Sequence, residues 1–207
     1  MTTATAIQEK QMMSTEEYLR LERKTLREKG GKYEFFNQKR LYMAGGTNPH
    51  NSTVYNAGLA IGIQIRQAKI KSNITTSETK VASFLNYKNY LYPDVVVVEG
   101  KPYYEDNFKD IVLNPTLIVE VPSESTEGFD RGDKFKSYRQ IKSLKEYILI
   151  DSKKKSIEQF YLDSEGEWRF GSEITEGSMR LYSFPIDLSV DDVYFDVEFE
   201  PITLTQD

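Results

Sequence analysis

The sequence predicts an α/β fold, with a mixed central sheet flanked by helices and preceded by an N-terminal helix and hairpin. Two apolar runs, 95–98 and 116–121, are rich in β-branched residues, as buried central strands are. Apolar residues recur at helical spacing from Val54 to Ala68, which indicates a long helix that buries one stripe. Because helix and strand patterns alternate along the chain, one sheet covered by helices accommodates all of them.

The N-terminal region is predicted to form one helix and a two-stranded hairpin, at residues 14–28, 33–36 and 40–44. Ser14 and Glu17 have the spacing of a capping box, so the helix should begin there. Asn37 and Gln38 separate two short β-type runs and are the expected turn of the hairpin.

The long helix follows a Gly-Gly turn. Asn48 is its expected N-cap and Pro49 its first helical residue. Proline is tolerated there because an N–H at the first helical position has no acceptor within the helix. Its buried stripe consists of apolar and small residues: Val54, Ala57, Gly58, Ile61, Ile65 and Ala68. His50 lies one turn before this stripe on the same face, so it should stand at the core-facing mouth of the helix.

The second half of the chain is rich in strands. They are expected at residues 74–78, 81–85, 95–98, 116–121, 146–151, 156–162, 168–171 and 184–188. A polar loop should occupy 99–114, and a helix 130–142 with Asp130 as its N-cap. A short helical turn is expected at 189–192.

Composition excludes several classes of function. The chain has no cysteine, which rules out disulfides, thiolate zinc sites, iron–sulfur clusters and a cysteine nucleophile. Its single histidine rules out a multi-histidine metal site and disfavours a histidine-based triad. The net charge of −5 hides an asymmetry, because residues 163–207 carry a net charge of −10 and leave +5 on residues 1–162. A mildly basic body is compatible with a phosphate-binding surface and also with an ordinary solvated one.

Length and hydropathy indicate the general class of protein. The 207 residues suit one domain, 1–207, with loose termini at 1–12 and 199–207. No run of about 18 apolar residues is present, and the polar N-terminal residues lack the apolar segment of a signal peptide. We therefore expect a cytoplasmic protein without a membrane partner.

Two carboxylates occur where the local pattern favours burial. Asp94 opens the run 95–98, and Glu120 lies inside the run 117–121. A charged carboxylate in such a strand costs several kcal/mol unless it is paired or binds a metal. Each acid alone has an ordinary explanation, an ion pair with a basic side chain. Two of them on neighbouring candidate strands favour a shared site.

The following helix offers a cation to this site. On a helical wheel, Tyr138 and Ile141 fall within roughly 40° of Lys134, so this lysine lies on the apolar face. Arg131 lies one turn earlier. Two carboxylates suit a hard ion such as Mg²⁺, and a lysine beside them can orient water or stabilise charge on a phosphoryl group. A plain salt bridge between Lys134 and Glu120, or a side chain that extends to solvent, is the alternative.

These residues belong to a longer pattern. The segments that carry it are Tyr33–Phe36, Met43–Thr47 with His50, Tyr92–Val95, Val119–Ser123, Ser125–Lys134, Ser143–Asp151 and Ser189–Tyr194. In their order and spacing they resemble the Uma family of restriction endonucleases, a branch of the PD-(D/E)xK nuclease superfamily. The resemblance extends from about Ser14 to Phe199.

The resemblance implies a restriction-endonuclease-like fold and Mg²⁺-dependent hydrolysis of DNA phosphodiester bonds, with Mn²⁺ as a substitute ion. It assigns metal binding to Asp94 and Glu120 and gives Lys134 the role of assisting the attacking water. The residues assigned to substrate binding or support are Glu34, His50, Lys80, Arg131 and Tyr138. By analogy with other nucleases of this fold that cut both strands, we also expect a homodimer.

The sequence departs from the family pattern at two positions. Pro122 stands where the family usually has leucine, and it removes a backbone donor just after Glu120. Lys80 stands where the family often has arginine, so the charge is kept while the bidentate geometry is lost. Two other functions stay open: a nucleic-acid-binding protein that does not cut, and a structural oligomer on the same fold.

Overall fold

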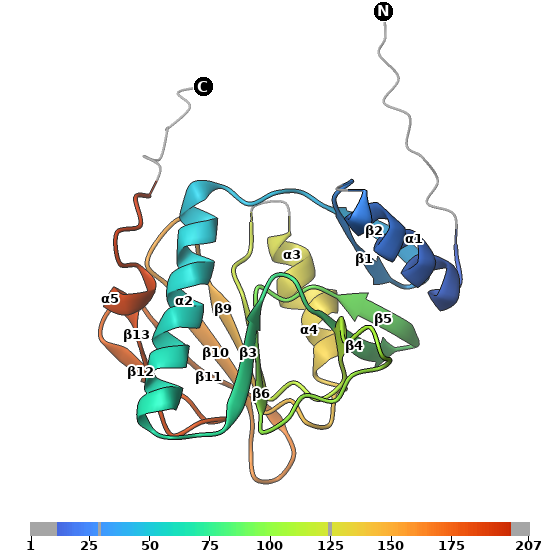
Figure 1. The fold of residues 1–207 in the computed structure, drawn as a ribbon. Coiled ribbons are helices and arrows are strands. Elements are labelled where there is room, and N and C mark those ends of the chain that lie inside the picture. The colour runs from blue at the N-terminus through green and yellow to red at the C-terminus, as the bar shows by residue number, and fades with distance from the viewer. Residues whose placement is uncertain (1–11, 29, 124–125, 200–207) are drawn as a thin grey trace, which may run out of the picture.

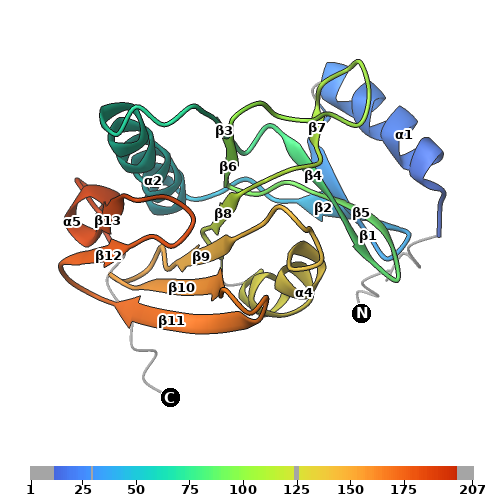
Figure 2. The same cartoon turned by 90° about the horizontal axis from the view of Figure 1, so that it is seen from below.

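The computed structural model describes residues 12–28, 30–123 and 126–199, and its framework consists of β-sheets (Figures 1 and 2). The six-stranded sheet has the order β11-β10-β9-β8-β6-β3 and mixes parallel and antiparallel pairs. Its strands are β3 (Ser72–Thr76), β6 (Val95–Glu99), β8 (Leu117–Glu120), β9 (Glu146–Ile150), β10 (Ile157–Leu162) and β11 (Trp168–Ile174). A small pair completes this side of the molecule: β12 (Ser178–Arg180) and β13 (Asp187–Ser189).

The five-stranded sheet has the order β2-β1-β5-β4-β7. Its strands are β1 (Lys32–Phe36), β2 (Lys39–Met43), β4 (Lys80–Leu85), β5 (Tyr87–Leu91) and β7 (Ile111–Val112). The β1–β2 hairpin turns through Asn37 and Gln38, which have φ values of 48° and 61°. Two positive φ values in a two-residue turn match the right-handed twist of the strands, so the predicted hairpin is confirmed.

Helices cover the two larger sheets. They are α1 (Thr15–Arg27), α2 (Asn48–Gln67), α3 (Glu127–Phe129), the π-helical turn η1 (Asp130–Lys134), α4 (Phe135–Tyr138) and α5 (Val190–Val193). Figure 2 shows α2 and α4 on opposite sides of the six-stranded sheet, with α1 beyond the five-stranded sheet. Ser14 is confirmed as the N-cap of α1, where its Oγ accepts a hydrogen bond from the Glu17 amide at 3.1 Å.

The core is divided by the six-stranded sheet. Because side chains alternate between the faces of a strand, Val95 and Val97 of β6 pack with α2, whereas Val96 and Val98 pack on the side of α4. All four side chains are at most 1% exposed, and each such burial contributes about 1.5–3 kcal/mol. A third cluster, with Tyr18 against Phe35 and Tyr90, joins α1 to the five-stranded sheet. Because both faces of β6 are buried, its residues do not alternate between apolar and polar side chains.

The predicted α/β class with helices flanking mixed strands is confirmed, but the strands form three sheets among the described residues instead of one. Strand β5 is not expected from the sequence; it follows β4 after a single residue, Asn86, which has a φ of 64°. Strand β7 lies inside the expected loop 99–114, and β12 is likewise not expected from the sequence. Strand β13, the partner of β12, is shorter than the strand expected at 184–188. Strands β7 and β12 are only two and three residues long, and β5 (Tyr87–Leu91) contains the polar residues Lys88 and Asn89, so local patterns carry little information about these strands.

The helix expected at 130–142 is displaced. The helical run begins at Glu127 and ends at Tyr138, so Asp130 is an internal residue and not the N-cap. Residues 130–134 form the π-helical turn, a feature that is often found at functional sites. The start of α2 differs by one residue, because Thr47 and not Asn48 is the N-cap.

None of the helices in the described part of the chain has the length and hydropathy of a membrane span. The expected loose termini fall almost entirely outside the described residues. Phe199, at the end of the described range, contacts Tyr194, with the two ring centroids 5.5 Å apart and the rings tilted by 52°.

Candidate active site

Asp94 and Glu120 lie opposite each other at one end of the six-stranded sheet. Strands β6 and β8 are antiparallel with Val95 facing Val119, which places the residue before β6 beside the last residue of β8. The Asp94 amide donates to Glu120 Oε2 at 3.3 Å, and the Val121 amide donates to Asp94 Oδ2 at 2.8 Å. These two hydrogen bonds fix both carboxylates relative to the strand ends. The shared location expected from the sequence is therefore found.

Lys134 inserts its ammonium among three carboxylates. Its Nζ lies 3.0 Å from Glu120 Oε1, 3.1 Å from Glu34 Oε1 and 3.3 Å from Asp130 Oδ1. The lysine is 4% exposed, so it points into the protein as the helical wheel predicts. Its position at the end of the π-helical turn, directly before α4, aims it at the strand ends.

Glu34 and Tyr138 complete the buried part of the cluster. Glu34 Oε1 also accepts a hydrogen bond from the Tyr92 amide at 2.9 Å, which fixes it near the chain segment that leads to Asp94. The Tyr138 hydroxyl donates to Glu120 Oε1 at 3.1 Å. Glu120 thus accepts hydrogen bonds at both oxygens, which restricts its rotation.

His50 stands at the more open side of the cluster. Its Nε2 lies 3.6 Å from Asp94 Oδ2, and the side chains of His50 and Asp94 are 17% and 15% exposed. Its Nδ1 is 3.3 Å from Asn51 Oδ1, and the Asn51 amide group donates to the Gly46 carbonyl at 3.2 Å. A Cβ on Gly46 would come within 2.4 Å of His50 Nδ1, so glycine is required for this arrangement. The histidine is therefore held in place by the loop before α2.

The electrostatics of the cluster are unbalanced toward negative charge. Burial raises the pKa of the Glu120 carboxyl well above its ordinary range, although Lys134 opposes the shift. Burial also raises the pKa of Glu34. For Lys134, burial by itself lowers the pKa, but the carboxylates of Glu120 and Glu34 outweigh it and hold the pKa well above its usual range. One ammonium thus faces several carboxyl groups, and an added cation would reduce their mutual repulsion.

The donor set fits a hard divalent ion. Asp94 and Glu120 offer carboxylate oxygens at one place, and Mg²⁺ is commonly held by one or two carboxylates while it keeps several waters. No group of three or more histidine, cysteine or acidic side chains arranged to hold a metal occurs within the described ranges. The cluster therefore suits an ion that binds water and substrate oxygens, and not an ion enclosed by protein ligands alone.

Two of the residues expected at the site lie elsewhere. Lys80, at the start of β4, bonds Asp110 at 2.9 Å and the Tyr92 hydroxyl at 3.2 Å. Arg131 pairs with Glu127 at 3.0 Å and donates to Glu158 at 2.6 Å on the outer side of the helix. Both are occupied by structural ion pairs away from Asp94 and Glu120. Neither contacts Asp94 or Glu120 within the described residues, and their role in substrate binding or support stays a prediction.

Asp130 is a member of the cluster that the sequence analysis did not include. It was assigned to a helix cap, whereas in the structure it is 3% exposed and contacts Lys134. Its position in the sequence could have indicated this contact, because Asp130 and Lys134 are four residues apart and such residues lie on one face of a helix.

Pro122 lies beyond the end of β8, so its missing N–H falls outside the hydrogen bonds between the strands.

With this geometry established, comparison with known families identifies the class of protein. Residues 15–188 match the model of the Uma2 family, described as "Putative restriction endonuclease". The match covers most of the chain, so the chain belongs to the Uma2 family.

The chain is also similar to two curated relatives and to one solved structure. An uncharacterized protein of Synechocystis sp. is 30% identical over 173 residues, covering 84% of this chain and 94% of the relative. A second uncharacterized Synechocystis protein is 29% identical over 196 residues, covering 90% of this chain and 94% of the relative. A crystal structure of a putative nuclease of the DUF820 group from Anabaena variabilis is similar in fold, with a TM-score of 0.60 at 14% identity. That similarity covers 79% of this chain and 89% of the Anabaena chain.

Proposed function

We propose that this protein is a metal-dependent endonuclease that hydrolyses DNA phosphodiester bonds, with Asp94 and Glu120 as the ligands of Mg²⁺. The observation that supports this most strongly is the pair of hydrogen bonds that holds the two carboxylates side by side, next to the ammonium of Lys134. Family membership supports the reaction class. The excess of carboxylates over ammonium groups supports the binding of a divalent cation.

Each residue of the cluster has a role that follows from its contacts. Glu120 holds Lys134 through an ion pair and presents its second oxygen toward Asp94. Lys134 is the donor that would hold the attacking water or stabilise negative charge on the phosphoryl oxygens. A bound Mg²⁺ would supply Lewis acidity and lower the pKa of a coordinated water. Glu34 and Tyr138 position the lysine and Glu120.

His50 is placed to meet the substrate. It lies on the more exposed side of the cluster, next to Asp94 and at the beginning of α2. An imidazole N–H there can donate to a phosphate oxygen of the bound nucleic acid. We assign it a substrate-positioning role. A homodimer, as expected from the sequence, would bring two such sites to the two strands of a duplex.

A cleavage assay tests the proposal. Supercoiled plasmid, a linear duplex, single-stranded DNA and RNA are incubated with wild type and with the variants Asp94→Asn and Glu120→Gln, with Mg²⁺ or Mn²⁺ and with EDTA. We expect cleavage of DNA that requires the ion and falls by at least 100-fold in both variants. Asp133→Asn, an exposed acid on the same helical run, is the matched control and should keep full activity.

The outcomes separate the candidate functions. Cleavage that persists unchanged in both variants contradicts the assigned site. DNA binding without any cleavage would favour a nucleic-acid-binding protein instead. Preferential cleavage of RNA would change the substrate class while leaving the site intact.

A further inference from the structure

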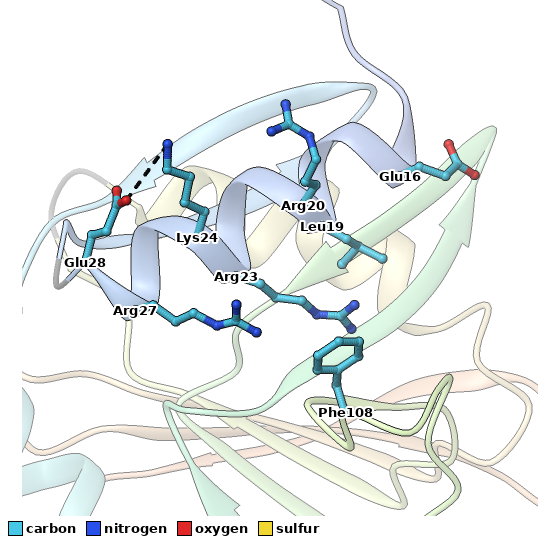
Figure 3. A pocket seen from close by; sticks show the side chains of 8 residues that line it. All are labelled: Glu16, Leu19, Arg20, Arg23, Lys24, Arg27, Glu28 and Phe108. Carbon is cyan, nitrogen blue, oxygen red and sulfur yellow. Dashed lines mark ion pairs between the residues drawn. The ribbon is translucent and has the colours of Figure 1, made fainter.

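A groove with basic side chains runs along α1, beside the loop that carries Phe108. The groove has a volume of about 670 Å³, and Figure 3 shows the side chains that line it. These are Glu16, Leu19, Arg20, Arg23, Lys24, Arg27, Glu28 and Phe108. Four of the eight are basic. None of them belongs to the acidic cluster around Lys134, so the groove is a separate feature.

The basic side chains form two rows. At roughly 100° per residue, the four positions fall within an arc of about 100° on the helix. In Figure 3, Arg23 and Arg27 extend to one side of the helix axis and Arg20 and Lys24 to the other. From Arg20 to Arg27 the helix rises by roughly 10 Å. Since each strand of a duplex carries one phosphate per about 3.4 Å of its axis, this length corresponds to about three phosphates.

Among the described residues, each row contains one paired and one unpaired base. In the row of Arg20, Lys24 pairs with Glu28 at 3.9 Å. Arg23 is held by Asp106 at 2.7 Å and Asp110 at 2.8 Å, and its guanidinium lies 4.1 Å from the ring of Phe108. Arg20 and Arg27 are exposed and have no ion-pair partner within the described parts of the chain. Their guanidinium groups are therefore available to an anionic ligand. A favourable interaction with the helix dipole explains a base in the last turn such as Arg27, but not Arg20 in the middle of the helix.

The inner face of α1 is tied to the acidic cluster. Glu22, 0% exposed, accepts hydrogen bonds from the Tyr33 amide at 3.0 Å and the Tyr92 hydroxyl at 3.3 Å. The Tyr92 amide in turn donates to Glu34, which contacts Lys134. A ligand bound on the outer face of α1 is thus held at a fixed offset from Asp94 and Glu120.

We infer that this groove binds the sugar–phosphate backbone of nucleic acid and holds the substrate of the proposed nuclease at a distance from the cleavage site. The inference rests on the proposed function for the identity of the substrate. The unpaired guanidinium groups of Arg20 and Arg27, one from each row and about 10 Å apart along the helix, complement the phosphates of a nucleic-acid chain. Phe108, 62% exposed, offers a ring on which a base can stack. A membrane surface fits less well, because the large exposed apolar side chain here is Phe108 alone among the lining residues.

Fluorescence anisotropy with a labelled 30-base-pair duplex and the matching single strand tests the inference. The titrations are made in EDTA at several salt concentrations, so that neither cleavage nor a metal ion contributes. The test variant is Arg20→Gln/Arg27→Gln, which takes one unpaired base from each row. Arg20→Lys/Arg27→Lys is the rescue variant, because it keeps both charges.

Arg66→Gln/Lys101→Gln is the control for net charge. Both residues are exposed, and Arg66 lies near the end of α2, a 20-residue helix whose first turn carries His50. At 1.5 Å per residue this is roughly 25 Å along the helix from that histidine. A purely global charge effect would weaken binding equally in this control and in the test variant.

We expect the test variant to bind DNA at least tenfold more weakly than wild type at low salt. Its slope of log K against log salt for duplex should be smaller by about 1.8, since each lost phosphate contact removes about 0.9. The lysine variant and the net-charge control should keep a slope near that of wild type.

Three results would overturn the inference. They are wild-type affinity in the test variant, an equal loss in the net-charge control, and arginine-dependent binding to vesicles of anionic phospholipid without binding to DNA. Failure of the proposed function is distinguishable from these, because it would appear as absent cleavage with Mg²⁺ while arginine-dependent DNA binding in EDTA persists.

Discussion

The carboxylate of Glu120 accepts a hydrogen bond from the backbone amide of Asp94, at 3.3 Å, across the antiparallel pair of β6 and β8. This contact joins the two acids through the strand register, since Val95 faces Val119 in the adjacent ladder position. A change of register by one residue would turn one of the acids to the other face of the sheet. The candidate site is therefore built into the pairing of two buried strands.

Lys134 should be essential for stability as well as for activity. In Lys134→Met, the buried carboxylates of Glu34 and Glu120 lose their shared cation, and we expect the free energy of unfolding to fall by about 3–5 kcal/mol. Lys136→Met removes an exposed lysine paired with Asp133 on the same helical run, and should cost less than about 1 kcal/mol. Urea unfolding monitored by circular dichroism measures both. Equal effects of the two substitutions would contradict the buried ion cluster.

The hydroxyl group of Tyr138 should contribute to DNA cleavage as well as to the stability of the fold. Tyr138→Phe removes the donor to Glu120 Oε1, with an expected cost of about 1–2 kcal/mol and a drop in DNA cleavage of about tenfold. Tyr147→Phe is the matched control, because its buried hydroxyl donates to the Asp130 carbonyl at 3.0 Å and not to a carboxylate of the site. We expect the two variants to lose a similar amount of stability and only Tyr138→Phe to lose cleavage activity. Equal cleavage in the two variants would argue against a positioning role.

Asp110 should stabilise the fold above about pH 4 and lose its effect in acid. Burial tends to raise its pKa, but hydrogen bonds from Arg23 and Lys80 lower it from the ordinary 3.8 to about 2. Because the folded-state pKa is depressed, the stabilisation is complete above the unfolded value and disappears as the pH falls through the folded value. The stability difference between wild type and Asp110→Asn should shrink by about 1 kcal/mol between pH 6 and pH 2, after allowance for solvent screening. Urea unfolding at several pH values measures it, and a difference independent of pH would contradict the ion pairs.

The hairpin turn offers a stabilising substitution. Gln38 has a φ of 61°, a left-handed conformation that is unfavourable for a residue with a Cβ. Gln38→Gly relieves this strain and should raise the free energy of unfolding by about 0.5–1 kcal/mol. Gln38→Ala keeps the Cβ and should give no such gain. Thermal and urea unfolding distinguish the two, and an equal gain in both would show that the turn geometry is not the cause.

The parts of the fold that could be predicted are those with local signals. The N-cap at Ser14, the turn at Asn37-Gln38 and the buried run that forms β6 each depend on neighbouring residues, and each is confirmed. The inward direction of Lys134 could also be predicted, because helical periodicity sets it. Strand β5 could not, since its recognition requires knowledge of its partners β1 and β4.

In the candidate site, too, some residues could be predicted from local sequence signals and others could not. Asp94 and Glu120 stood out because charge in a buried strand conflicts with the local pattern. Lys80 carries the same charge as Lys134, yet it pairs with Asp110, which is thirty positions away in the sequence. Tertiary packing determines which acid lies beside this lysine, so the pairing could not be predicted locally. Asp130 looked like a helix cap because nothing local reveals that the helical run begins three residues earlier.

The most direct test of the central claim is a calorimetric titration of the protein with Mg²⁺ and Mn²⁺, comparing wild type with Asp94→Asn/Glu120→Gln. Glu165→Gln/Glu176→Gln, which removes two exposed acids, controls for the change in net charge. We expect ion binding by wild type and by the control, and none by the Asp94/Glu120 variant, both without DNA and with a duplex that supplies phosphate oxygens. Equal binding by all three proteins, or no binding by wild type even in the presence of DNA, would contradict a metal site at Asp94 and Glu120.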